Sequence, residues 1–218
     1  ITQWRTHTLV QLLAREDLVM ISVWSPSFLT QLLDHAVAQR TELADAMVHS
    51  GAASVGRAEL VAASLAEDRP AYARIWPQLC VISCWDQASS AAQAAVVREA
   101  FPGVLVQGKG LLATEGLFTI PLLDQAWPVL SLESGYFEFR DAQGEVQGAA
   151  AVRENEIYEL IVTNGNGLYR YAMGDRVRVR GFTARTPLLE FVGRGPGRVD
   201  LCGEKLDEAF VLSALAPL

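Results

Sequence analysis

The chain has 218 residues, of which half are hydrophobic and a fifth are charged, and 25 acidic side chains outnumber 18 basic ones to give a net charge of −7. This composition is typical of a globular protein without disordered or low-complexity segments. A nucleic-acid surface needs clustered basic side chains, so the acidic balance argues against a nucleic-acid partner.

The apolar residues form no run near the roughly 20 residues that a membrane-spanning helix needs, and no secretory signal opens the chain. We therefore expect no membrane association and a cytoplasmic location. The three cysteines, Cys80, Cys84 and Cys202, lack the spacing of a zinc site. Because Cys80 and Cys84 lie in an apolar run, they are predicted to be buried free thiols.

The first half of the chain alternates helical and strand patterns. Residues 8–15 favour a helix and residues 18–23 a buried strand, after which Ser25-Pro26 starts a helix whose apolar spacing continues to residue 50. A further helix is predicted over residues 58–67.

A second strand and helix unit follows. Residues 79–84 predict a buried strand, residues 89–100 an alanine-rich helix and residues 104–107 a third strand. Repeated strand and helix units indicate a parallel sheet with flanking helices.

The pattern changes in the second half to short alternating runs, at residues 136–139, 159–163, 168–171 and 176–180. Such runs predict antiparallel strands. The sequence Asn164-Gly165-Asn166-Gly167 predicts a hairpin turn with a structural role. The predicted fold is therefore α/β, with a parallel sheet leading into a β-rich antiparallel portion, and we expect a division into residues 1–117 and 118–218.

The most informative stretch is Gly108-Lys109-Gly110-Leu111-Leu112-Ala113-Thr114-Glu115-Gly116, directly after the third predicted strand. A hydroxyl and a carboxylate beside exposed backbone amides can hold a phosphate and its metal ion, at the strand end where open α/β sheets bind ligands. From these residues alone, a loop that needs glycine only for its backbone geometry fits equally well.

Two later segments decide between these readings. Gly174-Asp175 follows the aromatic pair Tyr169 and Tyr171, and Phe191-Val192-Gly193-Arg194 comes after it. In this order, the three segments resemble the adenylate-forming superfamily, and within it the acyl acid amido synthetases known from plants as the auxin-responsive family, particularly their bacterial branch. Further similar segments cover residues 21–29, 79–85 and 199–206.

The resemblance implies that the chain is a central part of the large N-terminal domain of such an enzyme. Family members carry a phosphate loop upstream and a mobile C-terminal domain downstream, and neither is found in this sequence. The hinge to that domain would lie near Lys205.

The resemblance also implies site residues. Thr114 would donate to the α-phosphate of ATP, Glu115 would hold Mg²⁺, Asp175 would accept hydrogen bonds from the ribose hydroxyls, and Arg194 would lie near the ribose. Three of these residues have a purely structural alternative: Glu115 as a carboxylate at a helix start, Asp175 as a turn residue and Arg194 as a surface ion-pair partner.

Gly108 and Gly110 would flank the adenine, although Lys109 stands about where many family members have an aromatic residue. Trp85 is the candidate contact for the acyl substrate, with core packing as its alternative. Tyr169 and Tyr171 would line the nucleotide site or pack on the sheet.

The function implied is ATP-dependent and Mg²⁺-dependent activation of a small carboxylic acid as its acyl adenylate, followed by amide formation with an amino acid or another amine. An acyl-CoA ligase that shares the first step and a nucleotide-binding domain without catalysis are the alternatives. We expect this chain alone to be unable to complete turnover.

Overall fold

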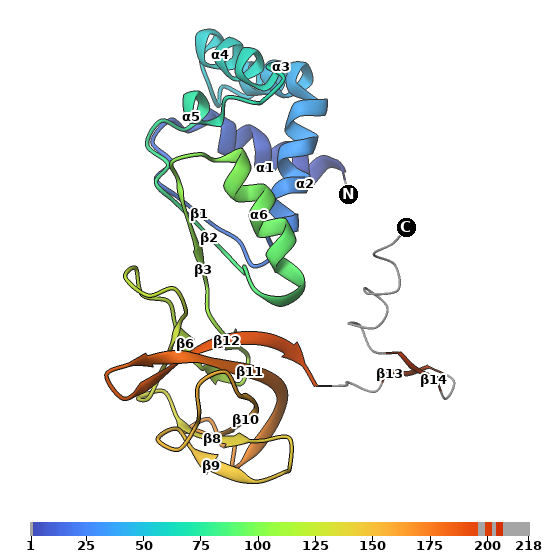
Figure 1. The fold of residues 1–218 in the computed structure, drawn as a ribbon. Helices are drawn as coiled ribbons and strands as arrows, with labels where there is room; N and C mark the ends of the chain where they lie inside the picture. Colours follow the sequence, from blue (N-terminus) through green and yellow to red (C-terminus); the bar gives the residue numbers. More distant parts are fainter. Residues whose placement is uncertain (1, 196–198, 202–203, 207–218) are drawn as a thin grey trace. The chain divides into compact units, whose positions relative to one another are not determined.

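The computed structural model describes residues 2–195, 199–201 and 204–206 (Figure 1). The chain divides into two compact units, Ile1–Lys109 and Gly110–Leu218. The division after residue 117 expected from the sequence is based on the positions of motifs, whereas these two units are defined by contacts within the structure. The division after residue 117 therefore stays a prediction.

The first unit is an α/β unit around a three-stranded parallel sheet with strand order β1-β2-β3. Its elements in chain order are α1 (Thr2–Ala14), β1 (Met20–Ser22), α2 (Pro26–Ala38), α3 (Arg40–His49), α4 (Val55–Leu65), α5 (Tyr72–Ile75), β2 (Val81–Cys84), the 3-10 turn η1 (Ala88–Ser90), α6 (Ala91–Ala100) and β3 (Leu105–Gly108). The predicted alternation of strands and helices is confirmed.

The two faces of this sheet differ because side chains alternate along a strand. Ile21 and Ile82 are register partners, and both are buried in the core that the helices supply. Met20 and Leu105, one position along their strands, are exposed. Ser22 pairs with Ser83 in the register and lies on the same side as Met20.

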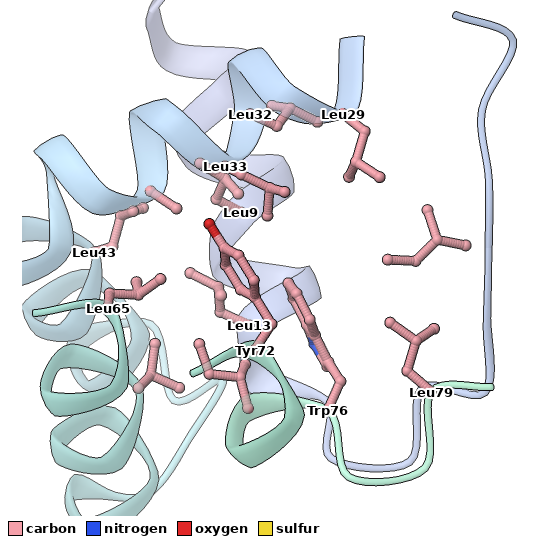
Figure 2. Close-up of a cluster of buried hydrophobic side chains, with 14 of the residues drawn as sticks. Leu9, Leu13, Leu29, Leu32, Leu33, Leu43, Leu65, Tyr72, Trp76 and Leu79 are labelled. Atoms are coloured by element: carbon pink, nitrogen blue, oxygen red, sulfur yellow. The ribbon is translucent and has the colours of Figure 1, made fainter. Parts of the chain in front are cut away.

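The core of the first unit is built from leucines of α1, α2, α3 and α4 around two stacked aromatic rings (Figure 2). Tyr72 stacks on Trp76 and on Phe101, with ring centroids 6.1 and 4.8 Å away. Burial raises the pKa of Tyr72 to about 12. The Trp76 indole donates a hydrogen bond to the carbonyl of Leu12, so this large side chain enters the core without an unpaired donor.

Arg57 is a buried cation in this core. Its guanidinium donates to the carbonyl oxygens of Leu13, Arg15 and Ile75, at 2.7 to 3.1 Å. These contacts tie α4 to the end of α1 and to α5. Burial lowers the pKa of Arg57, and the charge of Glu16, 3.9 Å away, partly opposes that effect.

Two predictions for the first unit are wrong in detail. The helix expected to continue to residue 50 is interrupted at Gln39, without a glycine or proline, and α3 starts at the next residue. The break lets Leu43 and Met47 of α3 join the core, so packing overrides local helical propensity. Cys84 is buried as predicted, but Cys80 is exposed. Cys202 lies outside the described residues.

The second unit is β-rich, as predicted, and is built on a seven-stranded antiparallel sheet with strand order β6-β7-β12-β11-β10-β8-β9. The described strands of the whole unit, including those outside this sheet, are β4 (Leu112–Ala113), β5 (Gly116–Leu117), β6 (Thr119–Ile120), β7 (Val129–Leu130), β8 (Tyr136–Arg140), β9 (Val146–Gly148), β10 (Ile157–Thr163), β11 (Tyr171–Thr183), β12 (Thr186–Arg194), β13 (Val199–Leu201) and β14 (Glu204–Leu206). The predicted fold class is therefore confirmed.

One face of this sheet forms a second core. Phe118, Phe137 and Phe139 lie there with Leu160 of β10 and Val177 of β11, all nearly inaccessible to solvent. The predicted turn at residues 164–167 connects β10 to the next segment. The strand predicted over residues 168–171 is wrong for most of its length, because β11 begins only at Tyr171.

In the part of the chain that the structure describes, no helix is both long enough and apolar enough to span a membrane.

Candidate nucleotide and acid sites

Thr114 and Glu115 form the tip of a tight hairpin in the second unit. The short strands β4 and β5 flank them, with Leu112 opposite Leu117 and Ala113 opposite Gly116. The alternative reading of Glu115 as a carboxylate at a helix start is therefore wrong. Both side chains stand at the turn between β4 and β5 rather than at a helix of the described part of the chain, and the Thr114 hydroxyl donates to the Glu115 carboxylate at 2.9 Å.

Asn164 holds this turn from the neighbouring loop. Its side-chain amide donates to the carbonyl of Glu115 at 2.6 Å, while its own carbonyl oxygen accepts from the backbone of Asn166 at 3.0 Å. One side chain thus joins the Asn-Gly turn to the Thr114-Glu115 turn. The sequence pattern predicts only a structural role for this asparagine, because it does not show which segment the side chain contacts.

An open depression of about 330 Å³ lies at this junction, lined by Thr114, Glu115, Asn166, Leu168 and Tyr171. The structure thus brings Tyr171 to the predicted phosphate turn. Sequence reasoning missed Asn166 and Leu168, although the Asn-Gly repeat marked their loop.

Asp175 and Arg194, predicted separately from two motifs, are directly paired. They are register partners across β11 and β12, and Arg194 Nε donates to Asp175 Oδ1 at 3.0 Å. The Asp175 side chain is 4% exposed and that of Arg194 is 70% exposed. Asp175 lies within β11, so its alternative role as a turn residue is wrong. The ion pair that was the structural alternative for Arg194 is present in the structure.

Burial raises the pKa of Asp175. The hydrogen bond and the positive charge of Arg194 act in the opposite direction, and the negative charge of Glu115 adds to the rise. The carboxylates expected to serve the metal and the ribose therefore influence each other electrostatically.

Among the described residues, no group of three or more His, Cys, Asp or Glu side chains could hold a metal ion by itself. Glu115 nevertheless offers a half-buried carboxylate next to the hydroxyl of the exposed Thr114. Mg²⁺ is commonly bound through one or two carboxylates, with the phosphates of the substrate supplying further oxygens. The residues present fit that mode, with Glu115 as the protein ligand.

Gly108 and Gly110 each meet a structural requirement that does not involve a nucleotide. A Cβ on Gly108 would lie 2.3 Å from Asp86 Oδ1, in the first unit. Gly110 has φ of +68°, and a Cβ there would lie 2.7 Å from the Thr119 hydroxyl. That hydroxyl accepts a hydrogen bond from the backbone of Leu111. Contact of either glycine with adenine stays a prediction.

Trp85 follows β2 at the carboxyl end of the parallel sheet and is 40% exposed, so the core-packing alternative is wrong. Trp24, which follows β1, lies beside it with ring centroids 5.5 Å apart. Lys109, which follows β3, places its ammonium 5.4 Å from the Trp24 ring centroid. Sequence reasoning missed Trp24, because its proximity to Trp85 depends on strand pairing.

Two predicted residues lie elsewhere. Tyr169 is 81% exposed and is not among the residues that line the depression. Lys205 lies on β14, opposite Asp200 of β13. Its role at a hinge stays a prediction.

The sequence profile described as the GH3 family central domain matches residues 128–194. A probable indole-3-acetic acid-amido synthetase, GH3.6 of Oryza sativa subsp. japonica, is 34% identical over 163 residues, covering 65% of this chain and 32% of the relative. The jasmonoyl-L-amino acid synthetase JAR6 of Nicotiana attenuata is 44% identical over 69 residues, covering 28% of this chain and 12% of the relative. The chain thus spans about a third of the length of the first of these relatives.

Solved structures show the same fold. The acyl acid amido synthetase AtGH3.15 in complex with 2,4-DB matches with a TM-score of 0.83 at 22% identity, covering 99% of this chain and 42% of that one. A 2-hydroxyisobutyryl-CoA ligase matches with a TM-score of 0.57 at 15% identity, covering 98% of this chain and 40% of that one. The chain therefore shares its fold with these two enzymes, and its residues 128–194 match the GH3 family central domain.

Proposed function

We propose that the protein activates a carboxylic acid with ATP as an acyl adenylate and then joins the acyl group to an amino acid as an amide. The observation that carries the proposal is the Thr114-Glu115 hairpin tip, whose carboxylate contributes to the raised pKa of Asp175. The relatives named above, an indole-3-acetic acid-amido synthetase and a jasmonoyl-L-amino acid synthetase, support the reaction class.

The chemistry has two displacements. In the first, a carboxylate oxygen attacks the α-phosphorus of ATP, the new P–O bond forms, and the bond to the β-phosphate oxygen breaks to release pyrophosphate. In the second, the amine nitrogen attacks the acyl carbon, AMP leaves with the electrons of the acyl–oxygen bond, and the nitrogen loses a proton. Both steps depend on positioning and on stabilisation of the charge on oxygen atoms.

Thr114 and Glu115 act on the phosphates in this proposal. The Thr114 hydroxyl, which donates to Glu115 in this structure, would turn its hydrogen toward an α-phosphate oxygen. Glu115 would be the carboxylate that holds Mg²⁺, and the metal would supply positive charge to the phosphates. The Asn164 contact fixes the backbone at Glu115, so the carboxylate needs little reorganisation.

Asp175 would hold the ribose. A carboxylate suits this task because it accepts from two hydroxyls and offers no competing donor. Its pairing with Arg194 orients the carboxylate, and the exposed guanidinium places a positive charge beside the nucleotide. Binding of the ribose hydroxyls needs the ionised form of Asp175. Burial raises the pKa of this carboxyl, but the hydrogen bond and charge of Arg194 favour the ionised form.

An acyl-CoA ligase is the second candidate, because a 2-hydroxyisobutyryl-CoA ligase shares the fold. The first displacement is identical, and the thiol of CoA replaces the amine in the second. Only the product distinguishes the two.

The test uses the complete natural protein with ATP, Mg²⁺ and a panel of aryl, indolyl and aliphatic acids. The first readout is the acid-dependent exchange of labelled pyrophosphate into ATP. The second is mass spectrometry of the product with amino acids or CoA as acceptors. Exchange followed by an amide product supports the proposal. A thioester product without any amide would instead support the acyl-CoA ligase. No exchange with any acid, from a folded protein that still binds AMP, would favour a nucleotide-binding domain without catalysis.

A further inference from the structure

Three arginines of β11, Arg176, Arg178 and Arg180, take no part in the proposed nucleotide site. β11 lies between β10 and β12 in the seven-stranded sheet of the second unit (Figure 1). Val177 and Val179, which alternate with the arginines, are completely buried in the core on one face of that sheet. Because successive side chains of a strand point to opposite faces, the arginines lie on the other face, which we call the outward face.

The carboxylate opposite Arg176 is already paired. Glu159 of β10 is the register partner of Arg176, so both side chains lie on the outward face. Glu159 is also the register partner of Arg140 in β8, and it is Arg140 that donates to the Glu159 carboxylate, at 3.0 Å. The carboxylate beside Arg176 is therefore neutralised by another guanidinium.

The carboxylate opposite Arg178 is paired in the same way. Glu190 of β12 is the register partner of Arg178, but its carboxylate lies 2.9 Å from Nε of Arg180. The Arg180 guanidinium also lies 4.8 Å from the centre of the Trp127 ring, a distance at which a cation is attracted to an aromatic face. Arg180 therefore has two partners, and the carboxylate beside Arg178 is neutralised.

Arg176 and Arg178 each keep a positive charge that has no partner. Among the residues that the structure describes, neither guanidinium forms an ion pair, and neither Nε has a hydrogen-bond partner although both Nε atoms are shielded from solvent. The terminal Nη nitrogens are open to solvent, since they are neither paired nor among the buried polar atoms. Both side chains are half-buried, and a guanidinium cannot lose its proton to relieve the charge.

Two unpaired cations at this spacing can receive one anion. Residues two positions apart in a strand have Cα atoms roughly 7 Å apart, so the two long side chains can converge on the same group. Without an anion the two charges repel each other, and the packing of their stems against the sheet limits screening by water. Because the ion pairs on either side are neutral, the excess charge of Arg176 and Arg178 is two.

We propose that Arg176 and Arg178 together bind one phosphate dianion on the outward face of the sheet, either as inorganic phosphate or as the phosphate group of a larger molecule. The dianion matches the excess charge of two, and its oxygens accept hydrogen bonds from planar guanidiniums, whose geometry suits phosphate. Asp175 precedes Arg176 and so points to the other side of β11. The phosphate site is therefore separate from the proposed nucleotide site, and the inference does not depend on the proposed function.

Isothermal titration calorimetry of the complete natural protein tests the binding directly. The probes are inorganic phosphate, glycerol phosphate and acetate, at a pH of about 8, where phosphates carry close to two charges, and at constant ionic strength. We expect at least one of the two phosphates to bind at least tenfold more tightly than acetate, because a dianion engages both guanidiniums. Equal affinity for acetate, or no binding of either phosphate, would overturn the proposal.

The two phosphates also distinguish the two sources of the ligand. Affinity for glycerol phosphate equal to or above that for inorganic phosphate supports a site for the phosphate group of a larger molecule. Affinity for inorganic phosphate that is at least tenfold higher supports a site for the free ion.

Variants assign the site to the two arginines. Arg176→Met and Arg178→Met keep an apolar stem without the charge, and each should weaken phosphate binding at least tenfold. Arg176→Lys and Arg178→Lys keep the charge but lose the planar fork, and each should weaken binding several-fold. The matched control is Arg185→Met, since Arg185 is an exposed arginine between β11 and β12, and this variant should bind phosphate like wild type. An equal loss in Arg185→Met would reduce the binding to general attraction by positive charge and contradict the proposal.

Stability separates a binding site from a structural role. Without phosphate, Arg176→Met and Arg178→Met should unfold at the same urea concentration as wild type or at a higher one, since each removes a repelling charge. Added phosphate should stabilise wild type but neither variant. If both variants are less stable than wild type without phosphate, and phosphate does not stabilise wild type, the arginines are structural and the inference is wrong.

Two further variants show whether phosphate occupies the proposed nucleotide site instead. Thr114→Val and Arg194→Met should both keep the phosphate binding that depends on Arg176 and Arg178. Loss of binding in these two variants, with binding retained in Arg176→Met, would assign the phosphate to the nucleotide site and overturn the inference. Pyrophosphate exchange is measured separately, so a protein that binds phosphate here but supports no exchange loses the proposed function alone. One that supports exchange but binds no phosphate on the outward face loses this inference alone.

Discussion

Asp175 and Arg194 form an asymmetric ion pair, in which a nearly buried carboxylate is matched by a largely exposed guanidinium 3.0 Å away. Removing one partner is therefore not equivalent to removing the other. Without Arg194, the carboxylate stays buried and loses its charge-assisted hydrogen bond, whereas without Asp175 the guanidinium returns to water at little cost.

We expect Arg194→Met to lower the free energy of unfolding at pH 7 by more than Asp175→Asn does. The expected loss for Arg194→Met is about 1 to 3 kcal/mol, the usual penalty for leaving a buried polar group without its partner. Urea denaturation of the two variants measures the difference. The reverse order would show that Asp175 is better solvated than its burial indicates.

The pH dependence of stability follows from the raised pKa of Asp175. The native state binds the proton more tightly than the unfolded chain does, so stability contributed by this group is present below its ordinary value near 3.8 and declines as pH rises through the raised native pKa. Asp175→Asn carries no charge at any pH, so it should lack this decline. Unfolding free energies across the acidic range test this, and superimposable slopes for wild type and variant would contradict it.

The side chain of Asn164 makes two hydrogen bonds, one as donor and one as acceptor, and substitutions can remove one or both of them. Asn164→Asp keeps the oxygen that accepts from Asn166 but loses the donor to the Glu115 carbonyl, and Asn164→Ala loses both. We expect both variants to lower kcat for adenylation at least tenfold, with stability reduced by only about 1 kcal/mol. An effect on stability alone, with kcat and the Mg²⁺ dependence unchanged, would reduce Asn164 to a structural residue.

Gly110 and Gly51 provide a matched pair of backbone tests. Both have positive φ, +68° and +70°, but a Cβ has open space at Gly51 and would meet the Thr119 hydroxyl and carbonyl at Gly110. Gly51→Ala should cost about 1 kcal/mol for its backbone conformation. Gly110→Ala should cost about 1 to 3 kcal/mol more, because Thr119 must shift. Thermal and urea unfolding measure both, and equal losses would mean that the Thr119 contact relaxes freely.

Among the charged residues of the first unit, we expect substitution of Arg57 to lower the free energy of unfolding the most. It donates to three backbone carbonyls from a buried position, and those carbonyls lose their partner in Arg57→Met. We expect a loss of about 3 kcal/mol or more in the free energy of unfolding. Arg74→Met, which removes an exposed pair with Glu67, should cost less than about 1 kcal/mol. Similar losses for the two variants would contradict the account of the core.

The sequence predicted most of the elements because their signals are local. Ser25-Pro26 marks the start of α2, and the alternating run at β8 matches a strand that buries every second residue. The strand predicted at β10 is also present, although it buries three consecutive residues, Leu160, Ile161 and Val162. The helix break at Gln39 could not be predicted, because the cause is the packing of Leu43 and Met47 from α3 rather than any local breaker.

The candidate site was predicted in its motifs but not in its contacts. The sequence identifies Thr114, Glu115, Asp175 and Arg194 individually. It does not show that Asp175 and Arg194 are paired, because these residues are 19 positions apart and meet only through the register of β11 and β12. Trp24 and Asn164 were missed for the same reason. Their partners, Trp85 and Glu115, lie far away along the chain.

The central claim is that Glu115 serves adenylation rather than folding. Its most direct test is acid-dependent pyrophosphate exchange by Glu115→Ala in the complete natural protein, beside Glu154→Ala, which removes an exposed carboxylate from a loop of the same unit. We predict that Glu115→Ala loses exchange by a factor of at least 100 while its urea unfolding matches wild type, and that Glu154→Ala retains both. Exchange by Glu115→Ala at the wild-type rate, or loss of its fold, would contradict the claim.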